Sequence, residues 1–278
     1  MKRFIILMTV MLLFTSCSHL WKKERVVISS EQVSNAIMID DNYLLNKYLS
    51  DGFPIDYENN GETLLKLALE NNSLKSLSTL LDRGADIDAR DNKTGMTPIF
   101  YSRSIEALKL LLKDGADINV YDYEGNSLFS YFIKNKPISY CYLLMKYHPN
   151  YQEWNTLFQA AISGNDELIR KMAKSGANFA QKDKDGNYPI YYSYDEKNIL
   201  ALLDVASYDL KAKNKKGEII LGEVYLRSVA NNFPQAINRL IELGVDLNYM
   251  SYGDNAISIA KNNNNAEMLE FLYEKGIK

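Results

Sequence analysis

Histidine and cysteine are the scarcest chemically reactive residues in this 278-residue chain, with two of each. His19 and His148 are too few for a histidine-based catalytic triad or a cage of several metal-binding histidines. Cys141 lies in the apolar run 138–144 and is interpreted as a small core residue. No phosphate-binding loop or dinucleotide motif is present either. We therefore expect no catalytic residue, no metal and no cofactor.

An excess of positive charge is also lacking, because the formal net charge is −3 and the pI is about 5.6. Proteins that follow nucleic-acid phosphates usually carry a basic balance, so we expect no nucleic acid as a partner. The segment 211–216 is locally basic. A solvated hairpin tip and a contact for an acidic patch on a partner are its two interpretations.

Hydrophobic runs long enough to span a bilayer are missing too. The longest, Phe4–Phe14, has 11 residues against the roughly 20 that a membrane helix needs. It follows the positively charged Lys2 and Arg3, as in a secretory signal peptide. The run ends in Leu13-Phe14-Thr15-Ser16-Cys17, which resembles the lipobox of bacterial lipoproteins.

This resemblance implies a signal peptide over residues 1–16 and lipid attachment, including palmitate, at Cys17. Several acyl chains anchor a protein stably where one does not. Residues 17–33 are charged and aperiodic, and are expected to form a lipidated tether. Ser18 follows the cysteine where a retention aspartate would stand, so the implied location is the cell envelope, at the outer membrane and facing the periplasm. Cleavage of a plain signal peptide before Ser18 stays the alternative.

The body of the chain is repetitive. The segment Leu81-Asp82-Arg83-Gly84-Ala85-Asp86-Ile87-Asp88-Ala89 recurs around Gly115, Gly176 and Gly244, with weaker copies at Gly52 and Gly276. Gly52, Gly84 and Gly115 are spaced by 32 and 31 residues, and Gly244 and Gly276 by 32. Degenerate copies stand between them at His148-Pro149-Asn150 and Ala206-Ser207-Tyr208.

A period near 33 with this motif resembles the ankyrin repeat. Thr97-Pro98-Ile99 and Tyr188-Pro189-Ile190 match the opening of its first helix, where proline is tolerated. The fold implied over residues 34–278 is mainly α, an ankyrin-repeat solenoid of helix pairs with short β-hairpin loops. About seven full repeats are expected, plus a partial one near residues 42–56. Two short units, 95–115 and 186–206, are expected to trim the turn between their helices.

Such a solenoid presents a concave surface of hairpin tips, and several tips here carry aromatic residues, which dominate interface energies. The predicted partner-binding residues are Tyr123, Asn126, Tyr151, Trp154, Lys184, Asn187, Lys215, Lys216 and Tyr252. Other positions in the same register are Lys93, Met96, Glu124 and Glu218.

Two classes of function stay open. The first is a membrane-anchored protein–protein interaction module, a monomer when unbound, which in its sharper version is an immunity-like protein that neutralises a toxic envelope enzyme. The second is an envelope hydrolase acting on peptidoglycan or lipid, which needs a cleft with converging carboxylates.

Overall fold

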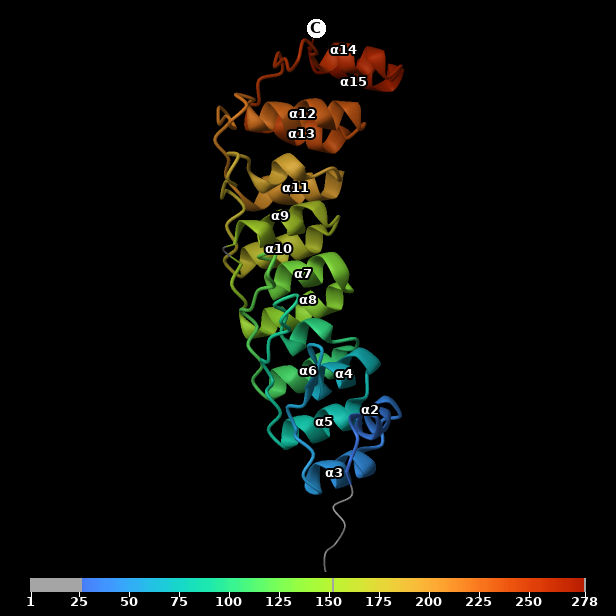
Figure 1. The fold of residues 1–278 in the computed structure, drawn as a ribbon. Coiled ribbons are helices and arrows are strands. Elements are labelled where there is room, and N and C mark those ends of the chain that lie inside the picture. The colour runs from blue at the N-terminus through green and yellow to red at the C-terminus, as the bar shows by residue number, and fades with distance from the viewer. Residues whose placement is uncertain (1–26, 152, 278) are drawn as a thin grey trace, which may run out of the picture.

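The computed structural model describes residues 27–151 and 153–277. Its helices pair into units that stack in one column, with the N-terminal and C-terminal units at opposite ends and the connecting hairpin loops along one edge (Figure 1). Cys17 and the proposed signal peptide lie outside the described residues. Within them, no helix combines the length and the apolar character that crossing a membrane requires.

The described residues form eight units, each with an inner element followed by an outer helix. In order, the pairs are α2 (Ser30–Met38) and α3 (Asn42–Ser50); α4 (Leu64–Asn71) and α5 (Leu74–Asp82); η1 (Pro98–Tyr101) and α6 (Ile105–Lys113); α7 (Leu128–Asn135) and α8 (Ile138–Leu144), continued by η2 (Met145–Tyr147); α9 (Trp154–Ile162) and α10 (Asp166–Lys174); η3 (Pro189–Tyr192) and α11 (Glu196–Val205); α12 (Ile220–Ala230) and α13 (Pro234–Leu243); α14 (Ala256–Asn262) and α15 (Ala266–Glu274).

Strand structure is confined to the hairpins. Strands β1 (Glu58–Asn59) and β2 (Glu62–Thr63) pair antiparallel across a turn in which Asn60 and Gly61 both have positive φ, 55° and 88°. Such a turn matches the twist of a two-residue hairpin. Single bridges, such as the one that joins Tyr121 to Ser127, mark later hairpins. The predicted fold class, helix pairs with short hairpin loops, is confirmed.

The first unit is complete rather than partial. Helix α2 begins inside the stretch that the sequence assigned to the tether, so the boundary predicted at residue 34 is four residues too late. Ser29 and Gln32 form a capping box that fixes the start of α2. Val33 and Ile37 are fully buried, which supplies the apolar contacts that hold this helix on unit 2.

Glycine ends most outer helices in a left-handed conformation, as the motif predicts. In unit 2, Gly84 has φ 82°, and the N–H groups of Gly84 and Ala85 donate to the carbonyls of Leu81 and Leu80. These bonds satisfy carbonyls that the helix itself leaves free. In unit 4, His148 takes the same conformation with φ 54°.

The two short units differ from the expectation. They keep three residues between the inner and outer elements, and what shrinks is the inner helix, which becomes a single 3-10 turn after Pro98 or Pro189. The prediction of a trimmed inter-helix turn is therefore wrong. Proline fixes where the inner element starts, and the missing residues are removed from its end.

Cations from the following unit satisfy the carbonyls at the end of each 3-10 turn. Lys136 Nζ donates to the carbonyl of Ser102 over 2.7 Å. In the second short unit, Arg227 Nη1 donates to the carbonyls of Tyr191 and Ser193, the latter over 3.0 Å. Both shortened units thus depend on a neighbour for hydrogen bonds that a full helix makes internally.

The core runs continuously through the column. Phe100, Phe129, Phe132, Phe179 and Tyr225 are its largest fully buried side chains. Cys141 belongs to it with 0% exposure, as predicted, and burial raises the pKa of its thiol to about 12. Each unit therefore completes its hydrophobic packing only against its neighbours.

Candidate functional site

Several of the predicted contact residues gather around one groove. A cavity of about 340 Å³ opens between the hairpin tips and inner helices of units 3 to 5. We call it the hairpin groove; its lining includes Lys93, Met96, Tyr123, Glu124 and Asn126, which the sequence register placed at tips. Polar side chains of α7 and α9, among them Ser130, Lys134 and Gln159, form its other wall. The groove mixes an aromatic ring, a thioether and charges of both signs.

Tyr123 is held in the groove by the preceding hairpin. Its N–H donates to the carbonyl of Thr94 over 2.8 Å, and its ring lies on Gly95, where a Cβ would come within 2.4 Å of the ring. Gly95 also has φ 73°, which disfavours side chains. Tyr123 is still 64% exposed. A large aromatic surface is thus fixed in place without being buried, which lowers the entropy lost when a partner binds it.

Trp154 and Tyr252 are also exposed and held by neighbours. Trp154 opens α9 with 50% exposure and packs edge-on against Phe158 at 5.8 Å between ring centroids. Tyr252, 86% exposed, donates its hydroxyl to Glu218 Oε1 over 2.7 Å. Partial burial raises the pKa of Glu218, but hydrogen bonds, including that from Tyr252, outweigh it and keep this pKa below its usual value. The carboxylate that orients Tyr252 is therefore ionised near neutral pH.

Tyr151 does not lie at a tip. It is 5% exposed, and its ring meets Phe129 edge-on at 5.2 Å. The register explains the error: the N–H of Asn150 bonds to Asn119, as that of Asp117 bonds to Asp88, so Asn150 occupies the aspartate position of the motif. The next residue, Tyr151, then takes the position of Ile118, which packs partly buried against the core. Tyr151, predicted as a contact residue, therefore lies in the core rather than at a hairpin tip, and the alignment of His148-Pro149-Asn150 with Gly-Ala-Asp contains the signal for this placement.

Asn187 is likewise buried, with 4% exposure. Its side-chain amide donates to Tyr192 and its oxygen accepts from Asn214 in the next hairpin, both over 3.0 Å. Asn126 makes the related link to Asn155 over 2.9 Å, but stays half-buried at the groove. The predicted contact role of Asn187 is therefore replaced by a structural one, in which it joins successive hairpins.

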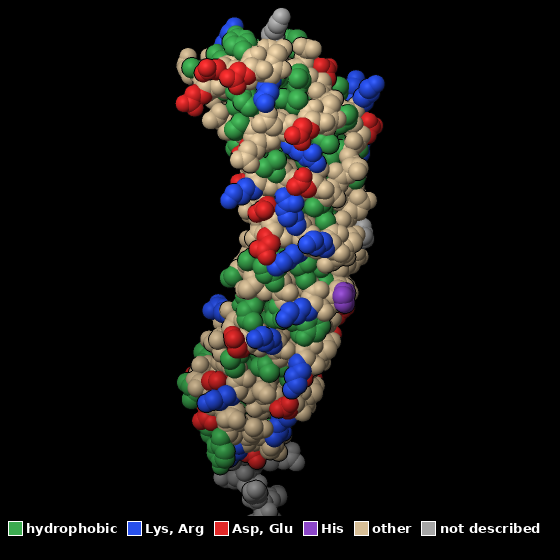
Figure 2. All heavy atoms as spheres, turned by 180° about the vertical axis from the view of Figure 1, so that it is seen from behind, with side chains coloured by type: hydrophobic (Ala, Val, Ile, Leu, Met, Phe, Trp, Pro, Cys, Tyr) green, Lys and Arg blue, Asp and Glu red, His purple; other side chains and the backbone are tan. Residues whose placement is uncertain are grey.

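Charge divides the hairpin edge into two parts. The loops of units 1 to 4 carry mainly exposed carboxylates, at Asp56, Glu58, Glu62, Asp86, Asp88, Asp117 and Glu124. The loop before unit 7 carries exposed lysines, at Lys211, Lys213, Lys215 and Lys216, while in the loop before unit 6 the exposed Lys182 and Lys184 alternate with Asp183 and Asp185. No described residue forms an ion pair with these lysines, which include the predicted Lys184, Lys215 and Lys216. The face opposite to that of Figure 1 instead mixes acidic and basic side chains along the column (Figure 2).

Asp91 is the main buried charge of the hairpin edge. It is 7% exposed and pairs with Lys66 Nζ of unit 2 at 2.5 Å. Burial alone raises the pKa of Asp91, but hydrogen bonds from Lys66, from the backbone of Lys93 and Thr94, and from Tyr101 hold it well below its usual range. This carboxylate anchors the loop that carries Lys93 and therefore shapes one wall of the groove.

Known proteins are similar to this chain in two respects. A family model for ankyrin repeats, in three copies, matches residues 35–122. The crystal structure of the ankyrin repeat domain of Bcl-3, a member of the IkappaB family, aligns with a TM-score of 0.63 and 18% identity, covering 76% of this chain and 97% of that one. The human ASB11 ankyrin repeat domain gives a TM-score of 0.58 at 18% identity, covering 72% and 98%. No curated protein matches the sequence.

The chain therefore has the ankyrin-repeat fold, and the matched repeats indicate a protein–protein interaction module. Neither comparison indicates a catalytic family. Within residues 27–151 and 153–277, no group of three or more histidine, cysteine, aspartate or glutamate side chains is placed to hold a metal ion.

Proposed function

We propose that this protein binds another protein through the hairpin groove and the adjacent hairpin edge. The observation that carries the proposal is that Tyr123, Met96 and Asn126, chosen from the sequence as tip residues, line one groove together. A concave site with an exposed aromatic anchor and a few polar groups is typical of a protein-binding surface. Two further exposed aromatic residues predicted as contacts, Trp154 and Tyr252, extend this surface along the column.

The charge pattern adds a direction to the proposed contact. Acidic loops precede and border the groove, while the lysine-rich loop before unit 7 follows it along the column. A partner whose surface carries the opposite order of charges is attracted in one orientation and repelled in the reverse one. The lysines have no carboxylate partner among the described residues, so they are free to meet acidic groups of a partner.

For the cellular setting, we propose a lipid anchor on Cys17 and a place in the bacterial cell envelope, at the outer membrane and facing the periplasm. The support is the short apolar run after Lys2 and Arg3 and the lipobox-like segment before Cys17. Within this setting we propose an immunity-like role, in which the protein binds a toxic envelope enzyme through the hairpin groove and neutralises it. The envelope hydrolase alternative gains no support from the comparisons, since they indicate no catalytic family.

Site-specific photo-crosslinking in the native cell tests the binding surface. A photoreactive amino acid placed at position 123 is expected to crosslink to one partner protein. The same photoreactive amino acid placed at position 147 is expected to form no crosslink. Tyr147 is a matched control because it is also an exposed tyrosine, 44% accessible, but follows an outer helix away from the groove. Equal labelling from both positions, or none from 123, contradicts the proposed surface.

The anchor is tested separately by Cys17→Ser. The variant is expected to leave the membrane fraction and to lose incorporated palmitate, because the acyl chains have no other attachment proposed in the chain. Membrane association that is unchanged by this substitution contradicts the anchor without affecting the groove.

A further inference from the structure

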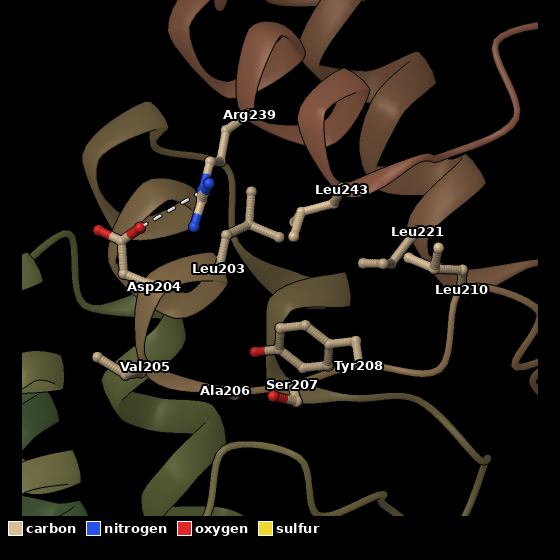
Figure 3. A pocket seen from close by; sticks show the side chains of 10 residues that line it. All are labelled: Leu203, Asp204, Val205, Ala206, Ser207, Tyr208, Leu210, Leu221, Arg239 and Leu243. Carbon is tan, nitrogen blue, oxygen red and sulfur yellow. Dashed lines mark ion pairs between the residues drawn. The ribbon is translucent and has the colours of Figure 1, made fainter.

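A second cavity lies away from the hairpin groove, between the outer helices of units 6 and 7. It measures about 420 Å³, and we call it the outer cavity (Figure 3). The end of α11, the loop 206–210 and helix α13 surround it. Leu203, Leu210, Leu221 and Leu243 supply its apolar walls (Figure 3).

The cavity opens where unit 6 departs from the repeat motif. The backbone turn at Asp209 matches that at Asp86, so Ser207 stands at the closing glycine and Tyr208 at the small residue that follows it. This register is one residue later than the alignment of Ala206 with glycine that the sequence spacing indicated. At the end of α13 in unit 7, the N–H groups of Gly244 and Val245 donate to the carbonyls of the last turn. The regular turn therefore fills this space and caps the helix at the same time.

Helix α11 lacks that cap. Ala206 has an extended conformation, and its N–H donates to the carbonyl of Leu202. No described backbone N–H donates to the carbonyls of Leu203, Asp204 or Val205, three residues that line the cavity. Free carbonyls at a helix end need donors from elsewhere. Two N–H groups that the glycine-closed units supply, from the glycine and the residue after it, are thus missing here.

Two buried polar side-chain atoms of residues that line the cavity also lack a hydrogen bond. The hydroxyl of Tyr208 is buried without a hydrogen bond to any described residue, and so is Nε of Arg239. The ring of Tyr208 lies below Leu203, and its hydroxyl turns toward the side on which Asp204 lies (Figure 3). Burial, together with the nearby Tyr188, raises the pKa of Tyr208 far above neutrality, so the hydroxyl keeps its proton. Buried polar atoms without partners are costly, and a ligand that pairs them is stabilised.

The charges around the cavity compensate one another. Arg239 Nε lies 3.6 Å from Asp204, and Nη1 lies 3.0 Å from Glu242. Asp204 also pairs with Arg170 at 3.0 Å. The guanidinium groups of Arg170 and Arg239 already pair with carboxylates. A charged ligand of either sign would therefore find no unpaired opposite charge in the cavity. A ligand of this cavity would therefore have to supply hydrogen-bond donors for the free carbonyls at the end of α11 and an acceptor for Tyr208 or Arg239. It would also have to supply apolar surface to cover the leucine side chains.

We propose that the outer cavity binds a neutral backbone amide that bears an aliphatic or aromatic side chain, presented by a segment of a protein partner. The amide N–H replaces the missing donors at the end of α11. Its carbonyl accepts from the Tyr208 hydroxyl or from Arg239 Nε, and its side chain covers the leucine walls. The partner segment thus takes the place of the turn that the regular units form from their own chain.

Chemical-shift mapping on the isotope-labelled full chain tests this with small probes. N-acetyl-leucinamide is expected to shift the amide signals of residues 203–210 and 239–243 saturably. N-acetyl-glycinamide lacks the side chain and isoamyl alcohol lacks the amide, so each is expected to bind about tenfold more weakly. Equal binding of all three probes, or no shift at these residues up to the solubility limit, overturns the proposal.

Tyr208→Phe removes the unpartnered hydroxyl while the ring that packs on Tyr188 at 5.0 Å is kept. We expect it to weaken N-acetyl-leucinamide about fivefold to tenfold. Tyr225→Phe is the matched control: its hydroxyl is also buried without a partner, but it does not line the cavity. An unchanged affinity in Tyr208→Phe, with circular dichroism confirming the fold, overturns the role of the hydroxyl. Tyr123→Ala in the hairpin groove should leave probe binding unchanged, so this test stands apart from that of the proposed function.

Discussion

Residues 35–122 match a model of ankyrin repeats, whereas the remainder of the column builds the same helix pairs from a motif that the model does not recognise. In the first part, Gly84 and Gly115 close their outer helices and an aspartate connects each loop to the next. In the second part, His148 and Ser207 stand at two of the closing positions, whereas Gly176, Gly244 and Gly276 close the other outer helices. The comparison shows that helix pairs can continue to stack even where the loop motif is lost.

What the two parts share is the buried row of the outer helices. Leu80 and Leu111 in the first part, and Met172, Leu240 and Leu272 in the second, all precede the closing residues by the same interval and are fully buried. Apolar burial at helical spacing is therefore enough to continue the stack where the turn motif decays. The irregular turns change what the surface offers, and the outer cavity is the clearest case.

Removing the Asp91 carboxylate should produce the largest loss in the regular part. Asp91→Asn leaves Lys66 without its partner, and we expect the free energy of unfolding in urea to fall by about 3 kcal/mol. Asp122→Asn, at the same place in the next loop, should lose about 1 kcal/mol because Asp122 has hydrogen bonds to Asn126 but no described ion pair. Equal losses of unfolding free energy in the two variants would show that the ion pair with Lys66 adds no stability beyond the hydrogen bonds of the loop.

The same pair predicts a pH dependence. The folded-state pKa of Asp91 is lowered, so its contribution is fully present above the pKa of the unfolded chain, about 4, and is lost as pH falls toward the folded-state value. The difference in stability between the native chain and Asp91→Asn should therefore be constant near neutral pH and shrink below about pH 4. Urea titrations at several pH values measure it, and a difference that does not change with pH contradicts the assignment.

In the irregular part, Arg227 should matter most. Arg227→Met removes the donor that satisfies the carbonyls of Tyr191 and Ser193, and we expect a loss of about 2 kcal/mol in the free energy of unfolding. Lys136→Met in the other short unit removes a single bond and should lose about 1 kcal/mol. A larger loss for Lys136→Met would reverse the comparison between the two units.

The closing residues give a smaller contrast. Gly244→Ala places a Cβ at φ 87°, so a destabilisation of about 1 kcal/mol is expected. Ser207→Ala, at the corresponding position of unit 6, should have almost no effect, since Ser207 does not adopt positive φ. Thermal unfolding of the two variants compares them directly. A similar cost at both positions would mean that unit 6 also depends on a left-handed closing residue.

The smallest effect is expected where the irregular part is made regular. His148→Gly relieves a left-handed histidine, so we expect a gain of about 0.5 kcal/mol, reduced by the greater freedom of glycine in the unfolded chain. Lys146→Gly, two residues earlier in the 3-10 turn η2, should instead lose stability. If thermal melts show that both substitutions change the stability in the same direction, the left-handed conformation of His148 does not explain the effect of His148→Gly.

Sequence periodicity predicted the helix pairs, their glycine ends and the burial of Cys141 because each depends on residues close together in the chain. The burial of Tyr151 follows from aligning His148-Pro149-Asn150 with Gly-Ala-Asp and carrying that register one residue further. Contacts across the stack were beyond the sequence pattern. Arg227 meets Ser193 34 residues away, and the role of Asn187 depends on Asn214 in the next loop.

The main packing contacts join each unit only to the one before it and the one after it, as α4 meets α2 and η1, and α12 meets η3 and α14. No such contact ties unit 1 to unit 8. The column therefore behaves as an elastic rod: a small rotation at one interface is carried to all later units, and rotations of the same sense add up along the axis. A rigid partner that contacts Tyr123 and Tyr252 at the same time would bind only one curvature of the column. Its affinity would therefore depend on any distortion of the units between these residues.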